Sequence, residues 1–129
     1  MAIKTVQTDK APKAVGPYSQ AVWANDTLYL SGQISIDPQT QELKSFDAKV
    51  TEQAKLVLSN VRGLLESQGL SLENVVKVTL FLKNMNDFAA VNEVYSQFFT
   101  KHRPARSTIE VARLPKDFLV EVEAIAVRS

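Results

Sequence analysis

The sequence predicts an α+β fold in which a mixed β-sheet carries two α-helices on one face. Two segments repeat apolar residues at spacings of three and four, which is typical of amphipathic helices. Six other segments are short, largely alternate apolar and polar residues, and are bounded by turn residues, as strands are. Their order is strand, hairpin, helix, strand, helix, strand, strand, which suits two layers around one core.

The first half of the chain is expected to hold three strands and the longer helix. The strands are 3–7, 19–24 and 27–34. Asn25 and Asp26 form a pair suited to a tight hairpin turn between the last two. Residues 36–42 are a turn-rich loop. Helical spacing then runs over 47–68, and Gly69 is placed to end this helix.

The second half is expected to hold the shorter helix and three further strands. The strands are 75–83, 106–111 and 118–127. In 75–83 the residues expected on the core face are Val76, Val78, Leu80 and Leu82. Asn84 or Asn86 can cap the helix, whose apolar face comprises Phe88, Val91, Tyr95 and Phe98. A turn around Pro115 joins the last two strands.

Length and composition predict one domain over residues 1–129. The chain is 45% hydrophobic and 22% charged, as globular domains are. Fifteen Lys and Arg against 14 Asp and Glu leave a net charge of +1, so no global field attracts nucleic acid or a membrane. No cysteine is present, which excludes thiolate nucleophiles. Without a signal peptide or a run of about 18 apolar residues, we expect a soluble, cytoplasmic protein.

The sheet face turned away from the helices is expected to mix apolar and polar side chains. Alternation places Glu121 and Glu123 there, and the same reasoning assigns Arg106 and Thr108 to that face. The remaining members are Leu119, Ile125, Val127, Glu110, Tyr29, Ser31, Gln33 and the residues of 75–83 that alternate with its core face. Because large apolar patches are uncommon on monomers, we expect a homo-oligomer built through this face.

Arg106 and Glu121 together could support hydrolysis of an activated carbon–nitrogen bond. A guanidinium binds a carboxylate bidentately, and a neighbouring Glu can take a proton from water. Hydrolysis of an imine that lies beside a carboxylate needs little more than these two groups, because the imine carbon is already activated. The plainer alternatives are that Arg106 forms a surface ion pair and that Glu121 and Glu123 are solvated. His102 is the only histidine, so neither a His-rich metal site nor a Ser-His-Asp triad is expected.

Five motifs resemble the reactive intermediate deaminase family, of the RidA type, also called YjgF-like. They are GPYSQA at 16–21, LSGQI at 30–34, MNDFAAVNEVY at 85–95, PARSTIEVARLPKD at 104–117 and VEVEAIAV at 120–127. The resemblance implies a chorismate-mutase-like fold and a homotrimer with sites between its subunits. It also implies hydrolysis of 2-aminoacrylate, 2-iminopropanoate and 2-iminobutanoate to 2-keto acids and ammonium. No cofactor is implied, and the substrates would come from pyridoxal-phosphate-dependent dehydratases.

The resemblance also implies roles for individual residues. Arg106 would grip the substrate carboxylate and Glu121 would activate water. Tyr18, after Gly-Pro, would close the cleft. The remaining implied contacts are a carboxylate contact from the backbone N–H of Gly32 with Ser31 beside it, a backbone carbonyl at Thr108, and support or substrate bonding by Asn92. Thr108 departs from the cysteine common in the family, which excludes thiol-based regulation here.

Two other functions stay open on the sequence. A non-enzymatic trimer could sense a small ligand or dock on another protein through the same Arg106. A ribonuclease or translation inhibitor is less favoured, because a near-neutral chain lacks the positive charge that phosphate binding needs. Glu123 has no assigned role.

Overall fold

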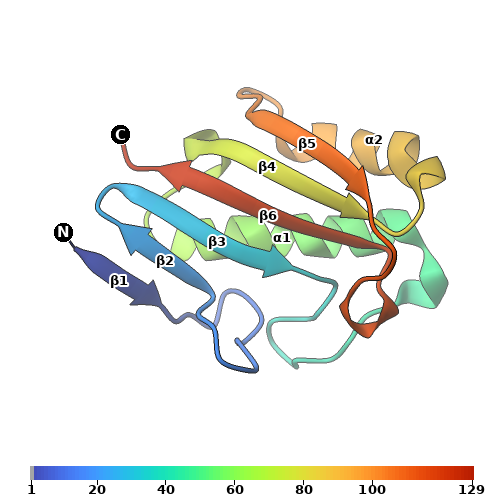
Figure 1. The fold of residues 1–129 in the computed structure, drawn as a ribbon, viewed down its shortest axis with the longest axis horizontal. Helices are drawn as coiled ribbons and strands as arrows, with labels where there is room; N and C mark the ends of the chain where they lie inside the picture. The colour runs from blue at the N-terminus through green and yellow to red at the C-terminus, as the bar shows by residue number, and fades with distance from the viewer. Residues whose placement is uncertain (1) are drawn as a thin grey trace.

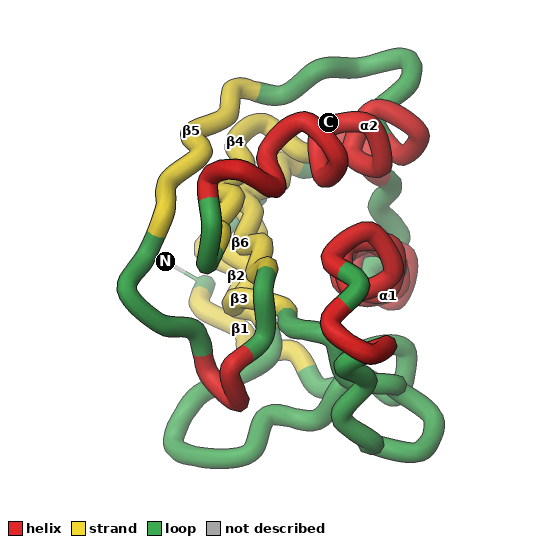
Figure 2. The backbone as a smooth tube through the Cα atoms, turned by 90° about the vertical axis from the view of Figure 1, so that its right-hand side faces the viewer, coloured by secondary structure: helices red, strands yellow, loops and turns green. Residues whose placement is uncertain are grey.

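Two helices lie on one face of a six-stranded sheet in the computed structural model, which describes residues 2–129. Figure 1 shows the sheet with the helices behind it, and Figure 2 shows the two layers from the side. The helices are α1 (Val50–Ser67) and α2 (Phe88–Phe98). The strands are β1 (Ile3–Val6), β2 (Ala21–Ala24), β3 (Thr27–Gln33), β4 (Val75–Leu82), β5 (Ala105–Glu110) and β6 (Val120–Val127). The predicted fold class is confirmed.

The strands lie side by side in the order β1-β2-β3-β6-β4-β5 (Figure 1). Strands β4 and β5 run parallel, and the other neighbouring pairs run antiparallel. Because parallel neighbours need a crossover connection, α2 carries the chain from the end of β4 back to the start of β5. This leaves β5 at the edge of the sheet beside α2.

The longer helix begins later than its apolar pattern predicts, at Val50 instead of residue 47. Phe46, Asp47 and Ala48 have φ values of 51°, 53° and 60°, which a right-handed helix excludes. Its end agrees with the sequence, because Gly69 adopts φ of 74° and Leu70 N–H donates to the Leu65 carbonyl at 3.0 Å. Within residues 2–129 no helix combines the length and apolarity that a membrane span needs.

The shorter helix is preceded by a 3₁₀ turn over Met85–Asp87. Of the two capping candidates, Asn84 is the residue used: its side-chain oxygen accepts from Asn86 N–H at 2.9 Å. The hairpin between β2 and β3 turns at Asn25, whose φ of 55° suits a tight turn.

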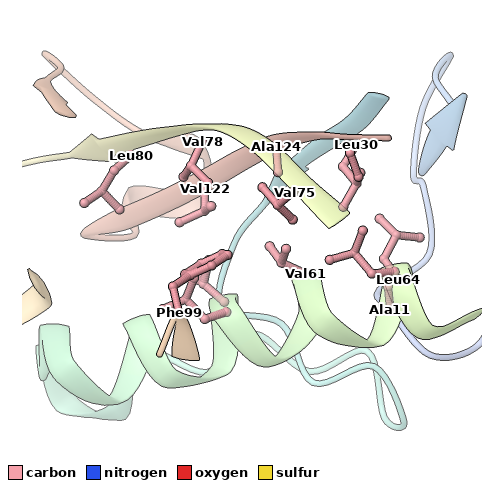
Figure 3. Packing of buried hydrophobic residues seen from close by; sticks show 14 of the residues in the cluster. Ala11, Leu30, Val61, Leu64, Val75, Val78, Leu80, Phe99, Val122 and Ala124 are labelled. Carbon is pink, nitrogen blue, oxygen red and sulfur yellow. The ribbon is translucent and has the colours of Figure 1, made fainter. Parts of the chain in front are cut away.

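An apolar core fills the space between α1 and the sheet. Figure 3 shows Val61 and Leu64 of α1 directed at the strands, with Phe99 packed beside them. On the sheet side the buried residues include Leu30, Val75, Val78, Leu80, Val122 and Ala124. Burial of each large side chain stabilises the fold by roughly 1.5–3 kcal/mol.

Two β-bulges interrupt the side-chain alternation that the sequence predicts. A register shift between Val75 and Lys77 buries Val75 and leaves Val76, which we expected in the core, 44% exposed. A second shift, between Leu30 and Gln33, turns both of these residues toward the helices, so Gln33 is buried instead of lying on the uncovered face. An extra residue reverses the side-chain direction of everything beyond it, which period-two reading cannot detect.

Residues 8–12 pass over α1 and are tied to the sheet by one buried amide. The Gln20 side chain accepts from Thr8 N–H at 2.7 Å and donates to the Pro12 carbonyl at 2.8 Å. The Lys10 carbonyl lies directly on Gly63 of α1, where a Cβ atom would overlap with it. Glycine at 63 therefore permits this close approach.

We expect Gly63→Ala to destabilise the protein, although alanine favours a helix interior by about 1 kcal/mol over glycine. The new methyl group would collide with backbone, which cannot rotate away as a side chain can. The urea midpoint should fall, whereas Ser59→Ala on the same helix should leave it unchanged or slightly raised. A midpoint for Gly63→Ala at or above wild type would contradict the close packing of Lys10 on α1.

Candidate functional site

A groove of about 890 Å³ is lined by residues from the end of β3, the start of β6 and nearby loops. Figure 1 shows these two strand ends side by side, with loops beside them. The acidic residues Glu121 and Glu123 of β6 reach it from the sheet. Its other lining residues include Lys13, Val15, Tyr18, Ser31, Gly32, Ile34, Gln41, Leu43 and Lys116. The groove therefore combines apolar walls with charges of both signs, which suits a small polar ligand.

Glu121 lies against the bulge of β3 at Gly32. A Cβ atom at Gly32 would stand 2.9 Å from Cδ of Glu121 and would overlap with its Oε2. Burial raises the pKa of Glu121, and the negative charge of Glu123 raises it further. A carboxyl group with a raised pKa exchanges protons with water near neutral pH more readily than an ordinary glutamate does.

Ser31 holds the loop that carries Tyr18 against the same bulge. Its hydroxyl donates to the Ser19 carbonyl at 2.6 Å, and its backbone N–H donates to the Gln20 carbonyl at 3.0 Å. Tyr18, just before these residues, is 54% exposed and lines the groove. The Ser31 hydroxyl is thus engaged in positioning the loop that carries Tyr18.

Arg106 belongs to a second cluster, on the side of the sheet where α2 lies. Its Nη1 donates to Oδ1 of Asn92 at 2.8 Å. Its guanidinium carbon lies 4.6 Å from the ring centroid of Tyr95 and 5.5 Å from that of Phe88. All three partners come from α2, so Arg106 is held by one hydrogen bond and two cation–π contacts.

The prediction that Arg106 and Thr108 share a face with Glu121 is wrong within one chain. Strand pairing sets Arg106 beside Val78 and Thr108 beside Leu80, both fully buried under the helices. Glu121 pairs with Phe81, on the opposite face. The error came from taking Ile109 as a core residue. On this edge strand Ile109 points to the uncovered face and is 42% exposed.

The uncovered sheet face keeps a mixed character despite these corrections. Tyr29 and Ile109 are 50% and 42% exposed, and Phe81 and Ile125 are half-buried. Lys77 donates to the Ser107 hydroxyl across this face at 3.0 Å. Apolar area of this kind still favours an interface between copies, which stays a prediction.

Sequence reasoning overlooked the aromatic partners of Arg106 and the cations of the groove. Tyr95 and Phe88 were expected only as core residues of the second helix, and their spacing of seven also suits a stacking platform. Lys13 and Lys116 line the groove together with Glu121 and Glu123. Lys116 has φ of 60°, a left-handed conformation that nothing in its residue type signals.

Comparison with known proteins gives this fold and site a family. The family model described as Endoribonuclease L-PSP matches residues 8–128. The chain is 49% identical over 128 residues to the 2-iminobutanoate/2-iminopropanoate deaminase of Escherichia coli, covering 97% of this chain and 98% of the relative. This chain belongs to the Endoribonuclease L-PSP family, which includes the YjgF and RidA proteins.

Solved structures agree with the assignment. The YjgF gene product of E. coli superimposes with a TM-score of 0.90 at 49% identity, covering 98% of this chain and 99% of that one. E. coli TdcF with bound serine gives a TM-score of 0.90 at 48% identity, with the same coverage. The resemblance inferred from the five motifs is confirmed.

We expect Glu121→Gln to stabilise the protein at neutral pH and not at low pH. A raised pKa in the folded state means that the charged form disfavours folding, so wild type loses stability as the pH rises from about 4.3 through the raised value. Urea unfolding between pH 4 and pH 8 should show the gap between variant and wild type widening with pH. The exposed Glu66→Gln should show no such trend, and a gap for Glu121→Gln that is constant with pH would contradict the raised pKa.

Proposed function

We propose that this protein hydrolyses reactive 2-imino acids and their enamine tautomers, such as 2-aminoacrylate, to 2-keto acids and ammonium. The observation that carries the proposal is a half-buried Glu121 with a raised pKa in a groove, on a chain 49% identical to a 2-iminobutanoate/2-iminopropanoate deaminase. Such a substrate is already electrophilic at the imine carbon. The site therefore needs only to bind the substrate carboxylate and to transfer protons to and from the reacting groups.

The reaction balances with water as the only co-substrate. The imine reacts with its nitrogen protonated. Glu121 accepts a proton from water while the water oxygen bonds to the imine carbon, and the C=N electron pair moves to nitrogen, which gives a neutral carbinolamine. Glu121 returns this proton to the nitrogen and then accepts the hydroxyl proton as the C–N bond breaks and the C=O bond of the 2-keto acid forms. The released ammonia takes that proton from Glu121 and leaves as ammonium. Arg106 holds the carboxylate beside the reacting carbon. An enamine first gains a proton at its terminal carbon.

The site is proposed to form between two copies of the chain. Within one chain Arg106 and Glu121 lie on opposite sheet faces, on β5 and β6 with β4 between them. An exposed β5 edge on one copy can reach the groove of another, and the apolar uncovered face supplies area for contact. We propose the homotrimer that the resemblance implies.

The remaining site residues receive roles in this arrangement. Tyr18 would close the groove over the substrate, and the N–H of Gly32 would bond to the carboxylate. Ser31 supports Tyr18 through its hydroxyl, and Asn92 supports Arg106. Thr108 would contribute its backbone carbonyl toward the imine nitrogen or the water. We also propose that the protein works in the cytoplasm, beside pyridoxal-phosphate-dependent dehydratases that release such imines.

Substitution of either principal residue should abolish most of the activity. Arg106→Ala and Arg106→Lys should each lower kcat/KM by about 100-fold, because lysine lacks the bidentate fork. Glu121→Ala should lower kcat by roughly 10²–10⁴. The measurement follows decay of an imine generated by a threonine dehydratase, with Arg62→Ala and Glu66→Ala as exposed controls.

Two results would reject the proposal that this protein is a hydrolase. One is that wild type does not accelerate imine decay. The other is that ligand binding depends on Arg106 while Glu121→Ala leaves every measurable function intact, which would favour a non-enzymatic sensor.

Mixing two inactive variants tests whether the site is shared between copies. Arg106→Ala subunits retain Glu121, and Glu121→Ala subunits retain Arg106. Random assembly of equal amounts joins an intact Arg106 to an intact Glu121 at about one site in four, so about a quarter of wild-type activity should return. The two variants are refolded together and assayed against each refolded alone. A site built within one chain predicts no recovery.

A further inference from the structure

We infer that Tyr95 is a positioning residue for Arg106, and that its buried hydroxyl is kept free to accept a hydrogen bond from the guanidinium when Arg106 binds a carboxylate. The inference rests on the proposed function for the role of Arg106. It assigns to the hydroxyl of Tyr95 a task that packing of the helix does not require.

The hydroxyl of Tyr95 is an exception in an otherwise satisfied interior. Tyr95 is 8% exposed, and its Oη is the one buried side-chain polar atom in residues 2–129 without a hydrogen-bond partner. Burying an unpaired hydroxyl destabilises a protein, and phenylalanine would fill the same space without that cost. An orphaned polar group of this kind calls for a functional reason.

The ring of Tyr95 is held between two neighbours, which fixes the place of its hydroxyl. On one side it stacks on Phe99, with ring centroids 4.7 Å apart and an interplanar angle of 28°. It also lies under the guanidinium of Arg106 at 4.6 Å. The hydroxyl lies close enough to Arg106 for hydrogen bonding from the guanidinium to lower the pKa of Tyr95, yet the two groups form no hydrogen bond of good geometry in the unliganded chain.

The donors of Arg106 leave room for this bond. A guanidinium has five N–H groups in one plane; Asn92 takes one, and a carboxylate takes two. Two donors remain. Asn92 and Tyr95 stand three residues apart on α2, hence on the same side of the helix, and together they can hold the plane of the guanidinium.

Both acceptors are uncharged, which matters for an anion site. Burial raises the pKa of Tyr95, and the charge of Arg106 together with hydrogen bonding from its guanidinium opposes that rise only in part, so the phenol stays neutral. A carboxylate in the same place would neutralise Arg106 and compete with the substrate. Asn92 and Tyr95 orient the guanidinium while leaving its positive charge for the ligand.

The test is Tyr95→Phe, which keeps the ring and removes only the hydroxyl. Thermal unfolding at matched protein concentration should show a Tm raised by about 2 °C or more, because an unpaired buried group is gone. KM for the imine should rise about tenfold with kcat little changed, since the carboxylate is held equally before and during reaction. Binding of pyruvate, measured by calorimetry, should weaken by a similar factor.

The matched control is Tyr29→Phe, which removes a hydroxyl that is 50% exposed on the uncovered face and should change none of these values. A raised Tm with unchanged KM and unchanged pyruvate binding would overturn the inference. A lowered Tm would do the same, because it would mean that the hydroxyl already has a partner. Wild type that binds pyruvate through Arg106 without turning over imines would reject the proposed hydrolase, and the binding result for Tyr95→Phe would still decide the role of Tyr95.

Discussion

The parallel pairing of β4 with β5 is the constraint on which the rest of the arrangement depends. It requires a crossover, and that crossover is α2, which lies on the helix-covered side of the sheet. The register then aligns Arg106 with buried Val78, so the arginine faces Asn92 and Tyr95 instead of the groove. A site that uses both Arg106 and Glu121 must for this reason draw on more than one copy.

Several local features of the two clusters oppose stability. The charge of Glu121 is disfavoured by burial and by Glu123, the Tyr95 hydroxyl has no partner, and Lys116 adopts a left-handed conformation. Each costs free energy that the core between α1 and the sheet must offset. Their concentration around the groove and Arg106 is the pattern expected where selection acts on chemistry.

The two charged residues of the proposed site have different surroundings. Arg106 is surrounded by neutral acceptors and aromatic rings, which orient its charge without cancelling it. Burial, and after it the charge of Glu123, raises the pKa of Glu121 and favours its protonated form. A cationic group and a proton-exchanging group suit a 2-imino acid, whose carboxylate and imine carbon are adjacent.

The sequence by itself determined the fold class, the five family motifs and the positions of most helices and strands. Helical and strand periodicities are local, so α1, α2 and the six strands could be predicted within a few residues. Only the tertiary structure decided which way the edge strand faces, because Ile109 and Arg106 alternate equally well in either direction. The bulges at Ser31–Gly32 and Val76, the orphaned hydroxyl of Tyr95 and the approach of Lys10 to Gly63 likewise depend on contacts between distant segments, which no local pattern records.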